Sequence, residues 1–252
     1  MKTAKYLIVR VIPSKVANSF IKKEHYSHKV VRNSQLHLGV FINNKLHGVL
    51  QFGPSLDKRK IISLVKDTKL NEFIELNRLA FDNELPKNSE SRAISISLKL
   101  IKKNAPHIKW VISFADGTMC GDGTIYRASG FYLIGIKKNS DLWKLPNGAI
   151  EHSFNFKVAR KGLLQKLYNK DGVSSSKALK RIGAVRLKGF QFKYIYFLKS
   201  SYKKLLTVPI IPFTKIDEIN GGMYKGNRIT LKERRVSSLM NKTPINLIDD
   251  GG

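Results

Sequence analysis

The hydrophobic and polar positions of the first 150 residues follow strand-like and helix-like periods in turn. Apolar alternation predicts a strand over Tyr6–Ile12 and a hairpin formed by Leu38–Ile42 and Leu46–Phe52. Between them, helical spacing begins with Ser14 as the expected N-cap and ends near His25. The chain is therefore expected to start in the order strand, helix, hairpin.

The next pattern is a strand, a helix and a second strand. Phe73–Phe81 is apolar enough for a strand, Ser89–Asn104 places its apolar residues on one helical face, and Lys109–Ala115 is typical of a strand buried on both faces. Because a helical crossover joins parallel strands, these two strands are expected to be parallel neighbours. Asp116 then lies at the carboxyl edge of the pair, where ligands of such sheets bind.

The rest of the chain predicts a short helix at 124–129, a strand at 131–136, a Lys- and Arg-rich stretch, and a strongly alternating strand at 190–198. The fold class expected from this order is α/β (α+β), with a mixed central sheet and helices on both faces. The expected organisation is a catalytic core at 1–148, a basic C-terminal insertion or arm at 149–189, final strands at 190–231 and a flexible tail at 232–252.

Charge changes the picture most. The net charge of +28 predicts a polyanionic partner, and DNA or RNA is the first expectation. Basic stretches at 160–161, 177–186 and 199–204 are candidates for backbone contacts, although any one of them alone is more often a solvated face. The single cysteine, Cys120, excludes an internal disulfide framework, so a cytoplasmic location is expected. No apolar run approaches the length of about 20 residues that spans a bilayer, so a membrane is not an expected partner.

Several enzyme signatures are missing. The chain has neither a phosphate-binding G-x-x-x-x-G-K-[ST] loop nor a strand-anchored G-x-G-x-x-G motif. It contains no Pro-Pro pair, which excludes the Asp/Asn-Pro-Pro-aromatic motif of adenine methyltransferases. The H-x-E and P-C-x-x-C pattern of zinc deaminases is also missing.

A set of short segments nevertheless resembles the Mom family of phage DNA-modification proteins, in order and with compatible spacing from Tyr26 to Arg228. These segments are His25–Ser27, Gly39–Phe41, Gly48–Gly53, Glu75–Ala80, Pro86–Ala93, Ser113–Asp116, Gly123–Ala128 and Phe190–Leu198. The resemblance implies a GNAT-like acyltransferase fold that converts adenine in DNA to N6-carbamoylmethyladenine and so protects phage DNA from host restriction enzymes. It also implies a phage or prophage protein that acts in the bacterial cytoplasm.

Transferred to this sequence, the resemblance implies catalytic roles for His25, Tyr26, Arg78, Asp116 and Tyr126. Each has a structural alternative. Asp116 could cap its loop, Tyr126 could be a core tyrosine, and the His25-Tyr26 pair could simply end a helix. Arg78 lies within an apolar strand and therefore needs an anionic partner, which could be Asp116, Glu75, a cofactor phosphate or DNA.

Two cofactors are expected. Ser91 and Arg92, in the first turn of a helix, could receive the pyrophosphate of acetyl-CoA or a related acyl donor together with Lys87, although the usual acyltransferase loop is replaced by Pro86–Arg92. Simple attack on a thioester would join N6 to a carbonyl carbon, whereas carbamoylmethylation joins it to a methylene. A redox metal would resolve this, and the resemblance suggests iron, with His25, Tyr26 and Asp116 as ligands.

The target adenine is expected to be flipped out of the duplex or taken from single-stranded DNA. Two other functions remain open from the sequence alone. One is a GNAT-type N-acyltransferase that acts on a protein or RNA amine, and the other is a non-catalytic basic DNA-binding protein.

Overall fold

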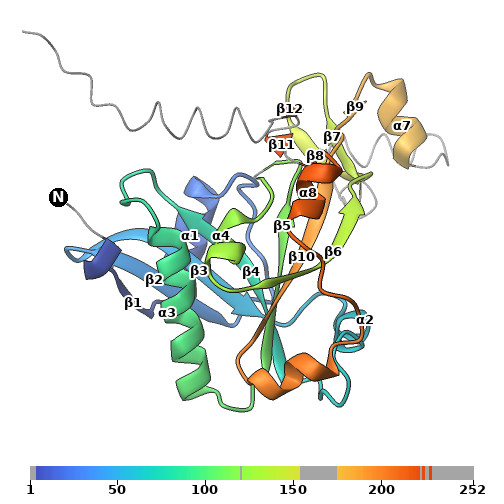
Figure 1. Cartoon of the computed structure of the whole chain (residues 1–252). Coiled ribbons are helices and arrows are strands. Elements are labelled where there is room, and N and C mark those ends of the chain that lie inside the picture. The colour runs from blue at the N-terminus through green and yellow to red at the C-terminus, as the bar shows by residue number, and fades with distance from the viewer. Residues whose placement is uncertain (1–3, 120, 154–174, 222, 225–226, 229–252) are drawn as a thin grey trace, which may run out of the picture. The chain divides into compact units, whose positions relative to one another are not determined.

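The computed structural model describes residues 4–119, 121–153, 175–221, 223–224 and 227–228, which belong to two compact units (Figure 1). The first unit comprises Met1–Asp116, Gly123–Lys137 and Gln191–Phe213, and the second comprises Gly117–Asp122, Lys138–Phe190 and Thr214–Gly252. Residues 160–161 and the expected tail at 232–252 lie outside the described residues.

The first unit is built on a seven-stranded sheet in the order β1-β2-β3-β4-β5-β10-β6. Its strands are β1 (Ile8–Val11), β2 (Leu36–Ile42), β3 (Lys45–Gly53), β4 (Phe73–Phe81), β5 (Trp110–Asp116), β10 (Phe190–Phe197) and β6 (Tyr132–Lys138). The pairs from β1 to β4 and the β5–β10 pair are antiparallel, whereas β4 and β5 are parallel. The expected mixed α/β sheet is therefore confirmed.

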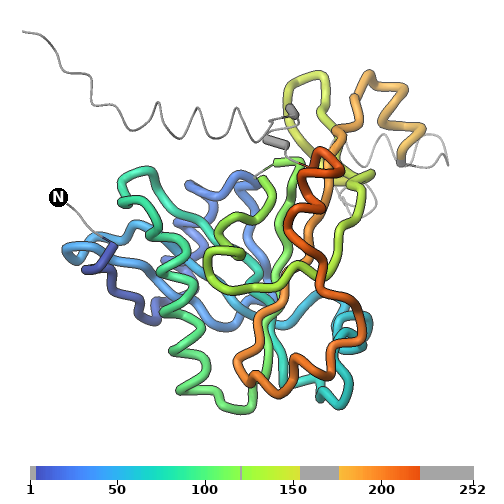
Figure 2. Tube along the Cα trace, in the orientation of Figure 1, coloured from blue at the N-terminus to red at the C-terminus, as the bar shows by residue number. Residues whose placement is uncertain are grey.

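The strand β10 illustrates how distant parts of the chain meet. It lies between β5 and β6, although the second unit supplies most of the chain between β6 and β10 (Figure 2). Its alternating sequence places Phe192, Tyr194 and Ile195 among the buried residues. The strand that comes last in the sequence is thus an interior strand of the sheet, next to β5.

The first unit also contains α1 (Ser14–Glu24), α2 (Lys58–Ile62), α3 (Ser89–Asn104), α4 (Thr124–Ala128) and 3-10 turns at Ala4–Tyr6 and Ser200–Leu205. The helix α3 crosses one face of the sheet in Figure 1, and α1 covers the other, where Ala17 and Ile21 pack against Val49 and Ala80. Helices on both faces agree with the prediction from sequence.

Two details of the predicted start of the chain are wrong. The strand begins only at Ile8, because Ala4–Tyr6 forms a 3-10 turn. Ser14 is the first helical residue and not the N-cap; Pro13 occupies that position in an extended conformation, without a side-chain capping hydrogen bond. Proline fits there because its ring fixes φ near −65° and it has no N–H group that needs a partner.

The parallel strands β4 and β5 are held together at their amino-terminal ends by aromatic packing. The rings of Phe73 and Trp110 stack with centroids 4.4 Å apart and planes 5° from parallel. Ile112 and Ile195 complete the same buried cluster. The strands are therefore fixed where they start, and any separation between them has to occur toward their carboxyl ends.

The second unit contains a small sheet in the order β8-β7-β9. Its elements are β7 (Leu142–Lys144), β8 (Ile150–His152), α7 (Ser175–Arg181), β9 (Val185–Arg186), α8 (Thr214–Glu218), β11 (Met223–Tyr224) and β12 (Asn227–Arg228). Trp143, Leu145, Leu179 and Ala184 form its core. The described part of the expected basic insertion is thus packed around an apolar cluster. Among the described residues of the whole chain, no helix is both long and apolar enough to cross a bilayer.

Candidate active site

A cleft opens in the first unit where β4 and β5 diverge. The two strands pair over only three residues, from Phe73 opposite Trp110 to Glu75 opposite Ile112, although β4 continues to Phe81 and β5 to Asp116. Beyond that point the strand edges separate, and a cavity of about 360 Å³ lies between them. This volume is at the lower end of the range of small-molecule sites.

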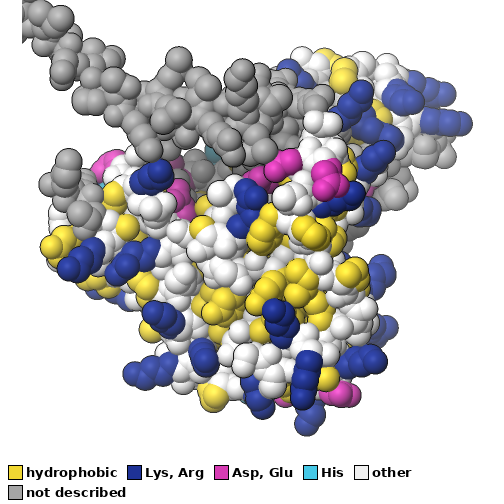
Figure 3. Space-filling view, in the orientation of Figure 1, with side chains coloured by type: hydrophobic (Ala, Val, Ile, Leu, Met, Phe, Trp, Pro, Cys, Tyr) yellow, Lys and Arg dark blue, Asp and Glu magenta, His cyan; other side chains and the backbone are white. Residues whose placement is uncertain are grey.

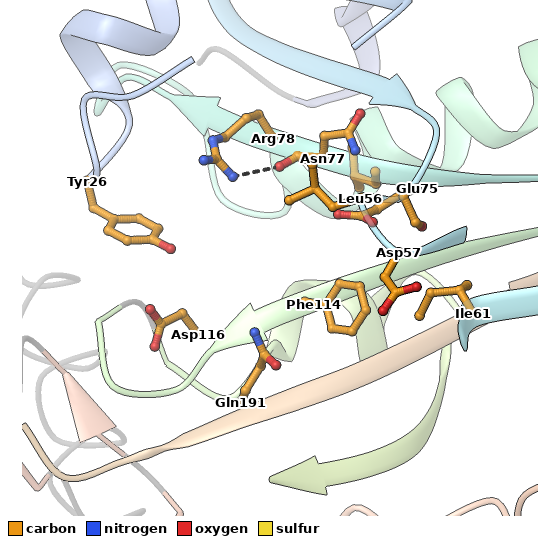
Figure 4. A pocket seen from close by; sticks show the side chains of 12 residues that line it. Tyr26, Leu56, Asp57, Ile61, Glu75, Asn77, Arg78, Phe114, Asp116 and Gln191 are labelled. Carbon is orange, nitrogen blue, oxygen red and sulfur yellow. Dashed lines mark hydrogen bonds between the residues drawn. The ribbon is translucent and has the colours of Figure 1, made fainter. Parts of the chain in front are cut away.

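The cavity is lined by residues from both diverging strands and from the loops beside them (Figure 4). The lining comprises Tyr26, Ser55, Leu56, Asp57, Ile61, Glu75, Leu76, Asn77, Arg78, Phe114, Asp116 and Gln191. A β-bulge shapes one wall: Gln51 of β3 faces Arg78, but the next residue, Phe52, faces Leu76, so that Asn77 is the extra residue. The bulge changes which side chains of β4 face the cleft.

Three of the predicted catalytic residues surround this cleft. Tyr26 follows α1 and is 42% exposed, Arg78 lies on β4, and Asp116 ends β5. Figure 4 shows the Tyr26 hydroxyl directed into the cleft, between the Arg78 guanidinium and the Asp116 carboxylate. Gln191, the register partner of Asp116 on β10, reaches the same space. One cation, one carboxylate and one phenol thus converge from three separate segments.

The positive charge of Arg78 is held by backbone carbonyl groups. Its Nε donates to the Lys29 carbonyl at 3.2 Å and its Nη1 to the Asn77 carbonyl at 2.9 Å. Burial lowers the pKa of Arg78, while the nearby Tyr26, Glu75 and Tyr126 oppose that shift. None of the carboxylates among the described residues forms a salt bridge with Arg78, but the charge of Glu75 favours the ionised guanidinium. The guanidinium is available to an anionic group of a ligand.

His25 is 7% exposed and packs against Tyr26, with the centroids of the His25 and Tyr26 rings 4.3 Å apart. The Ser27 backbone N–H donates to His25 Nδ1 at 3.1 Å. A backbone N–H can only donate, so Nδ1 is unprotonated and the ring is neutral with its proton on Nε2. Burial, with the charges of Arg78 and His28, lowers the pKa of His25 to about 3. His25 therefore supports Tyr26 as a neutral ring.

Sequence reasoning missed one strong feature of the cleft, the carboxyl group of Glu75. Burial raises the pKa of Glu75, while the side chains of Ser55 and Asn77 and the charge of Arg78 favour the ionised form. Ser55 is only 5% exposed, and its Oγ has no hydrogen bond of standard geometry. The available signal is an acidic residue inside an apolar strand, which the sequence suggests only as a partner of Arg78.

Tyr126 occupies a different environment from Tyr26. It is 6% exposed, and its ring centroid lies 5.4 Å from that of Phe131 and 5.2 Å from that of Tyr194. Gly123, with φ +79°, permits this packing, because a Cβ there would lie 2.5 Å from the Tyr194 ring. Tyr126 is not among the residues that line the cleft, although it influences the pKa of Arg78. Its surroundings match the core tyrosine alternative, and its catalytic role stays a prediction.

The predicted cofactor-binding residues lie at the start of α3 and do not line the cleft. Lys87 is exposed and precedes the helix, which begins at Ser89. Ser91 Oγ donates to the Asn88 carbonyl at 3.2 Å, and Arg92 Nη2 donates to the Lys5 carbonyl at 3.3 Å. The binding of an acyl donor by Lys87, Ser91 and Arg92 therefore stays a prediction.

The expected iron ligands are His25, Tyr26 and Asp116. Tyr26 and Asp116 share the cleft, but His25 Nδ1 is occupied by Ser27. Within the described part of the chain, no group of three His, Cys, Asp or Glu side chains is arranged to hold a metal ion. Protein sites for iron usually combine such ligands. The expected set includes a tyrosine and only two residues of these types, so iron binding by His25, Tyr26 and Asp116 stays a prediction, and no chemical step is assigned to a metal.

Positive charge is distributed over much of the face that Figure 3 shows. Figure 3 shows Lys and Arg side chains dispersed over the visible face and not gathered in one patch. Of the expected basic stretches, 177–186 belongs to α7, β9 and the turn between them, and 199–204 includes most of a 3-10 turn. In that turn, Lys203 Nζ lies 4.2 Å from the centre of the Tyr132 ring.

The fold and the cleft define an α/β protein whose central sheet is opened between two parallel strands, with a cavity at the opening. The chain belongs to the Mom protein family, whose model matches residues 6–215. It is 35% identical to the methylcarbamoylase Mom of Escherichia phage Mu over 207 residues, which cover 82% of each chain. The family membership expected from the short segments is thereby confirmed.

Solved structures with a similar arrangement include acetyltransferases. An acetyltransferase of Bacillus subtilis in complex with CoA aligns over 76% of this chain and 98% of its own, with 9% identity and a TM-score of 0.41. The spermidine/spermine N-acetyltransferase SpeG of Vibrio cholerae aligns over 80% and 98%, with 8% identity and a TM-score of 0.44. The family assignment rests on the sequence matches alone.

Proposed function

We propose that this protein is a DNA-modifying transferase of the Mom type, which converts adenine in DNA to N6-carbamoylmethyladenine and so protects phage DNA from restriction enzymes. The observation that carries the proposal is the 35% identity to a phage protein named methylcarbamoylase, over 82% of both chains. The net charge of +28 supports DNA as the substrate, because a strongly basic protein attracts a polyanion.

The cleft supports a reaction in which a planar base meets a small donor group. Its volume of about 360 Å³ suits one base and not a base pair within a stack. Phe114 and Leu76 supply apolar contacts, whereas Glu75, Asn77 and Gln191 supply hydrogen-bonding groups. Amide side chains such as those of Asn77 and Gln191 are suited to the adjacent donor and acceptor of adenine.

In the proposed reaction, a bond forms from N6 of adenine to the methylene carbon of a carbamoylmethyl donor. One N6–H bond breaks, and the bond between that methylene carbon and its leaving group also breaks, so that the leaving group departs with the electron pair. In this proposal the Asp116 carboxylate accepts the proton that leaves N6. Arg78 stabilises negative charge that develops on the donor, because its guanidinium lines the cleft and forms no salt bridge with a described residue. Tyr26 orients the base or the donor by a hydrogen bond from its hydroxyl, and the neutral His25 ring fixes the position of Tyr26.

An acyl donor such as acetyl-CoA is part of the same proposal. The positive end of α3, with Lys87 and Arg92 exposed beside it, suits the anionic part of such a donor. Acetyl-CoA alone could form a bond from N6 to its methyl carbon only with an oxidant, and the product would also need an amide nitrogen, so only the binding of such a donor is proposed and no step is routed through it. The protein is proposed to work in the bacterial cytoplasm, where phage DNA and acyl donors occur together.

The test is mass spectrometry of nucleosides from DNA of cells that express the protein. Wild type is expected to yield deoxyadenosine that carries the mass of a carbamoylmethyl group. Asp116→Asn keeps the shape of the side chain but removes its charge, so the modified nucleoside should be lost while the protein still folds and binds DNA.

The other outcomes are equally specific. Unmodified deoxyadenosine together with an acylated protein or RNA amine would replace the proposal by an N-acyltransferase acting on those substrates. DNA binding without any modified product would leave a non-catalytic DNA-binding protein. Retained modification by Asp116→Asn would remove Asp116 from its proposed role.

A further inference from the structure

Leu56 stands out on the surface of the first unit. Its exposed fraction is 92%, the highest among the exposed large hydrophobic residues that the structure describes. It lies in the short loop between β3 and α2 and belongs to the lining of the cleft. A fully exposed leucine at the entrance of a site offers apolar surface that a ligand can cover.

The loop holds Leu56 outward on a fixed base. On one side, Ser55 is buried, with 5% exposure. On the other, Asp57 Oδ1 accepts a hydrogen bond from the Lys60 backbone N–H at 3.4 Å, and its carboxylate pairs with Lys60 Nζ at 2.9 Å. Both neighbours of Leu56 are therefore anchored, so its side chain projects from a positioned turn.

Cations follow Leu56 directly in the chain. The helix α2 begins with Lys58, Arg59 and Lys60, and the side chains of Arg59 and Lys60 are exposed. Lys60 is engaged by Asp57, whereas Arg59 forms no ion pair with any residue that the structure describes. A projecting apolar side chain can contact stacked bases, and exposed cations beside it can contact the phosphates that flank those bases. This combination is therefore suited to nucleic acid.

An apolar side chain beside the cleft can assist the extrusion of a base from duplex DNA. The target atom of an adenine within a duplex is out of reach of side chains that line a cleft, so the adenine has to leave the stack to reach Asp116. Its departure leaves a gap, and apolar side chains such as leucine are inserted between base steps by proteins that distort DNA. Leu56 is beside the cleft into which the base would turn.

We propose that Leu56 is a wedge that enters the base stack of duplex DNA and occupies the space left by the extruded adenine, while the exposed Arg59 contacts a flanking phosphate. This inference rests on the proposed function, because it takes adenine in DNA as the substrate. It adds the form of the substrate, a duplex whose target base is extruded by the protein itself.

The test compares full-length wild type with Leu56→Ala and with Leu70→Ala. Leu70 is the matched control, since it is the same residue type, is 51% exposed and does not line the cleft. The probes are duplexes with 2-aminopurine, an adenine analogue whose fluorescence rises when it is unstacked, placed in every nearest-neighbour context. The same strands without a complement form the second set.

Wild type and Leu70→Ala are expected to raise the fluorescence of at least one duplex context. Leu56→Ala should need about tenfold more protein for the same rise, because the apolar surface that fills the gap is lost. Binding to the single strands, which have no duplex stack to open, should change by less than about twofold. A mismatch opposite 2-aminopurine should restore much of the response of Leu56→Ala, since the weakened pair opens without the wedge.

An equal response of Leu56→Ala and wild type on matched duplexes would overturn the wedge, as would an equal loss on duplex and single strand. These readouts need no donor, so they separate the two proposals. Wild type that produces modified deoxyadenosine but extrudes no base refutes the wedge alone. Wild type that extrudes 2-aminopurine through Leu56 but produces no modified nucleoside refutes the proposed function alone.

Discussion

Replacing His25 by Asn should remove a specific pH dependence of folding stability. His25 is 7% exposed, and its Nδ1 accepts a hydrogen bond from the Ser27 backbone N–H. Burial is the main cause that lowers its pKa from 6.5 to about 3, followed by the charges of Arg78 and His28. Asparagine keeps an acceptor atom near Nδ1 but does not titrate, so the variant isolates the proton equilibrium from the hydrogen bond.

The sign and size of the change in the free energy of unfolding follow from the protons that each state binds. Below pH 6.5 the unfolded chain binds a proton at His25, whereas the folded protein does not bind it until about pH 3. The free energy of unfolding therefore falls as the pH decreases through this window, by about 1.4 kcal/mol for each pH unit. Between neutral pH and about pH 5 the loss is about 2 kcal/mol, and it depends little on the exact folded value because that value lies well below pH 5.

The assay is urea unfolding, followed by tryptophan fluorescence at about pH 7.5 and about pH 5. From about pH 7.5 to about pH 5, the free energy of unfolding of wild type should fall by about 2 kcal/mol more than that of His25→Asn. All other titrating groups are common to both proteins, so the difference reports His25. The exposed His107 is the matched control, and His107→Asn should follow wild type. Parallel pH profiles for wild type and His25→Asn would refute the buried neutral histidine.

Three further predictions concern charge, acidity and packing. DNA binding should weaken about a thousandfold between about 50 and 200 mM salt if about six phosphates are neutralised, and a flat titration would contradict the electrostatic interpretation. Glu75→Gln should raise the free energy of unfolding more at about pH 8 than at about pH 4, because the raised pKa of Glu75 makes its ionised form unfavourable in the folded state; urea unfolding at both values checks this. Gly123→Ala should destabilise the protein by about 1–3 kcal/mol, since φ is +79° and the added Cβ would meet the Tyr194 ring. Thermal unfolding measures that loss, and an unchanged melting temperature would contradict the packing of Tyr126 described above.

The two tyrosines show where sequence reasoning about the site stops. The resemblance to the Mom family implies catalytic roles for both Tyr26 and Tyr126. In the structure, however, Tyr26 is 42% exposed in the cleft, whereas Tyr126 is 6% exposed and packs against aromatic rings. Their sequence neighbourhoods do not separate these environments, because the ring that covers Tyr126 comes from β10, far along the chain. Burial by a distant strand cannot be inferred from local spacing.

The sequence by itself determined most of the strands of the seven-stranded sheet, the helices α1 and α3 and the family. The alternation in β2, β3 and β10 and the helical period of α3 are local properties, since side chains two residues apart share a face in a strand and those three or four apart share one in a helix. The short segments that resemble Mom proteins are also local, and they were sufficient for the family.

Only the tertiary structure decided the cleft. Its opening depends on β4 and β5 being stacked at Phe73 and Trp110 but unpaired beyond Glu75 and Ile112, and on the bulge at Asn77. Register and strand separation are set by packing between residues that are distant in sequence, so the periodicity of either strand alone contains no information about them.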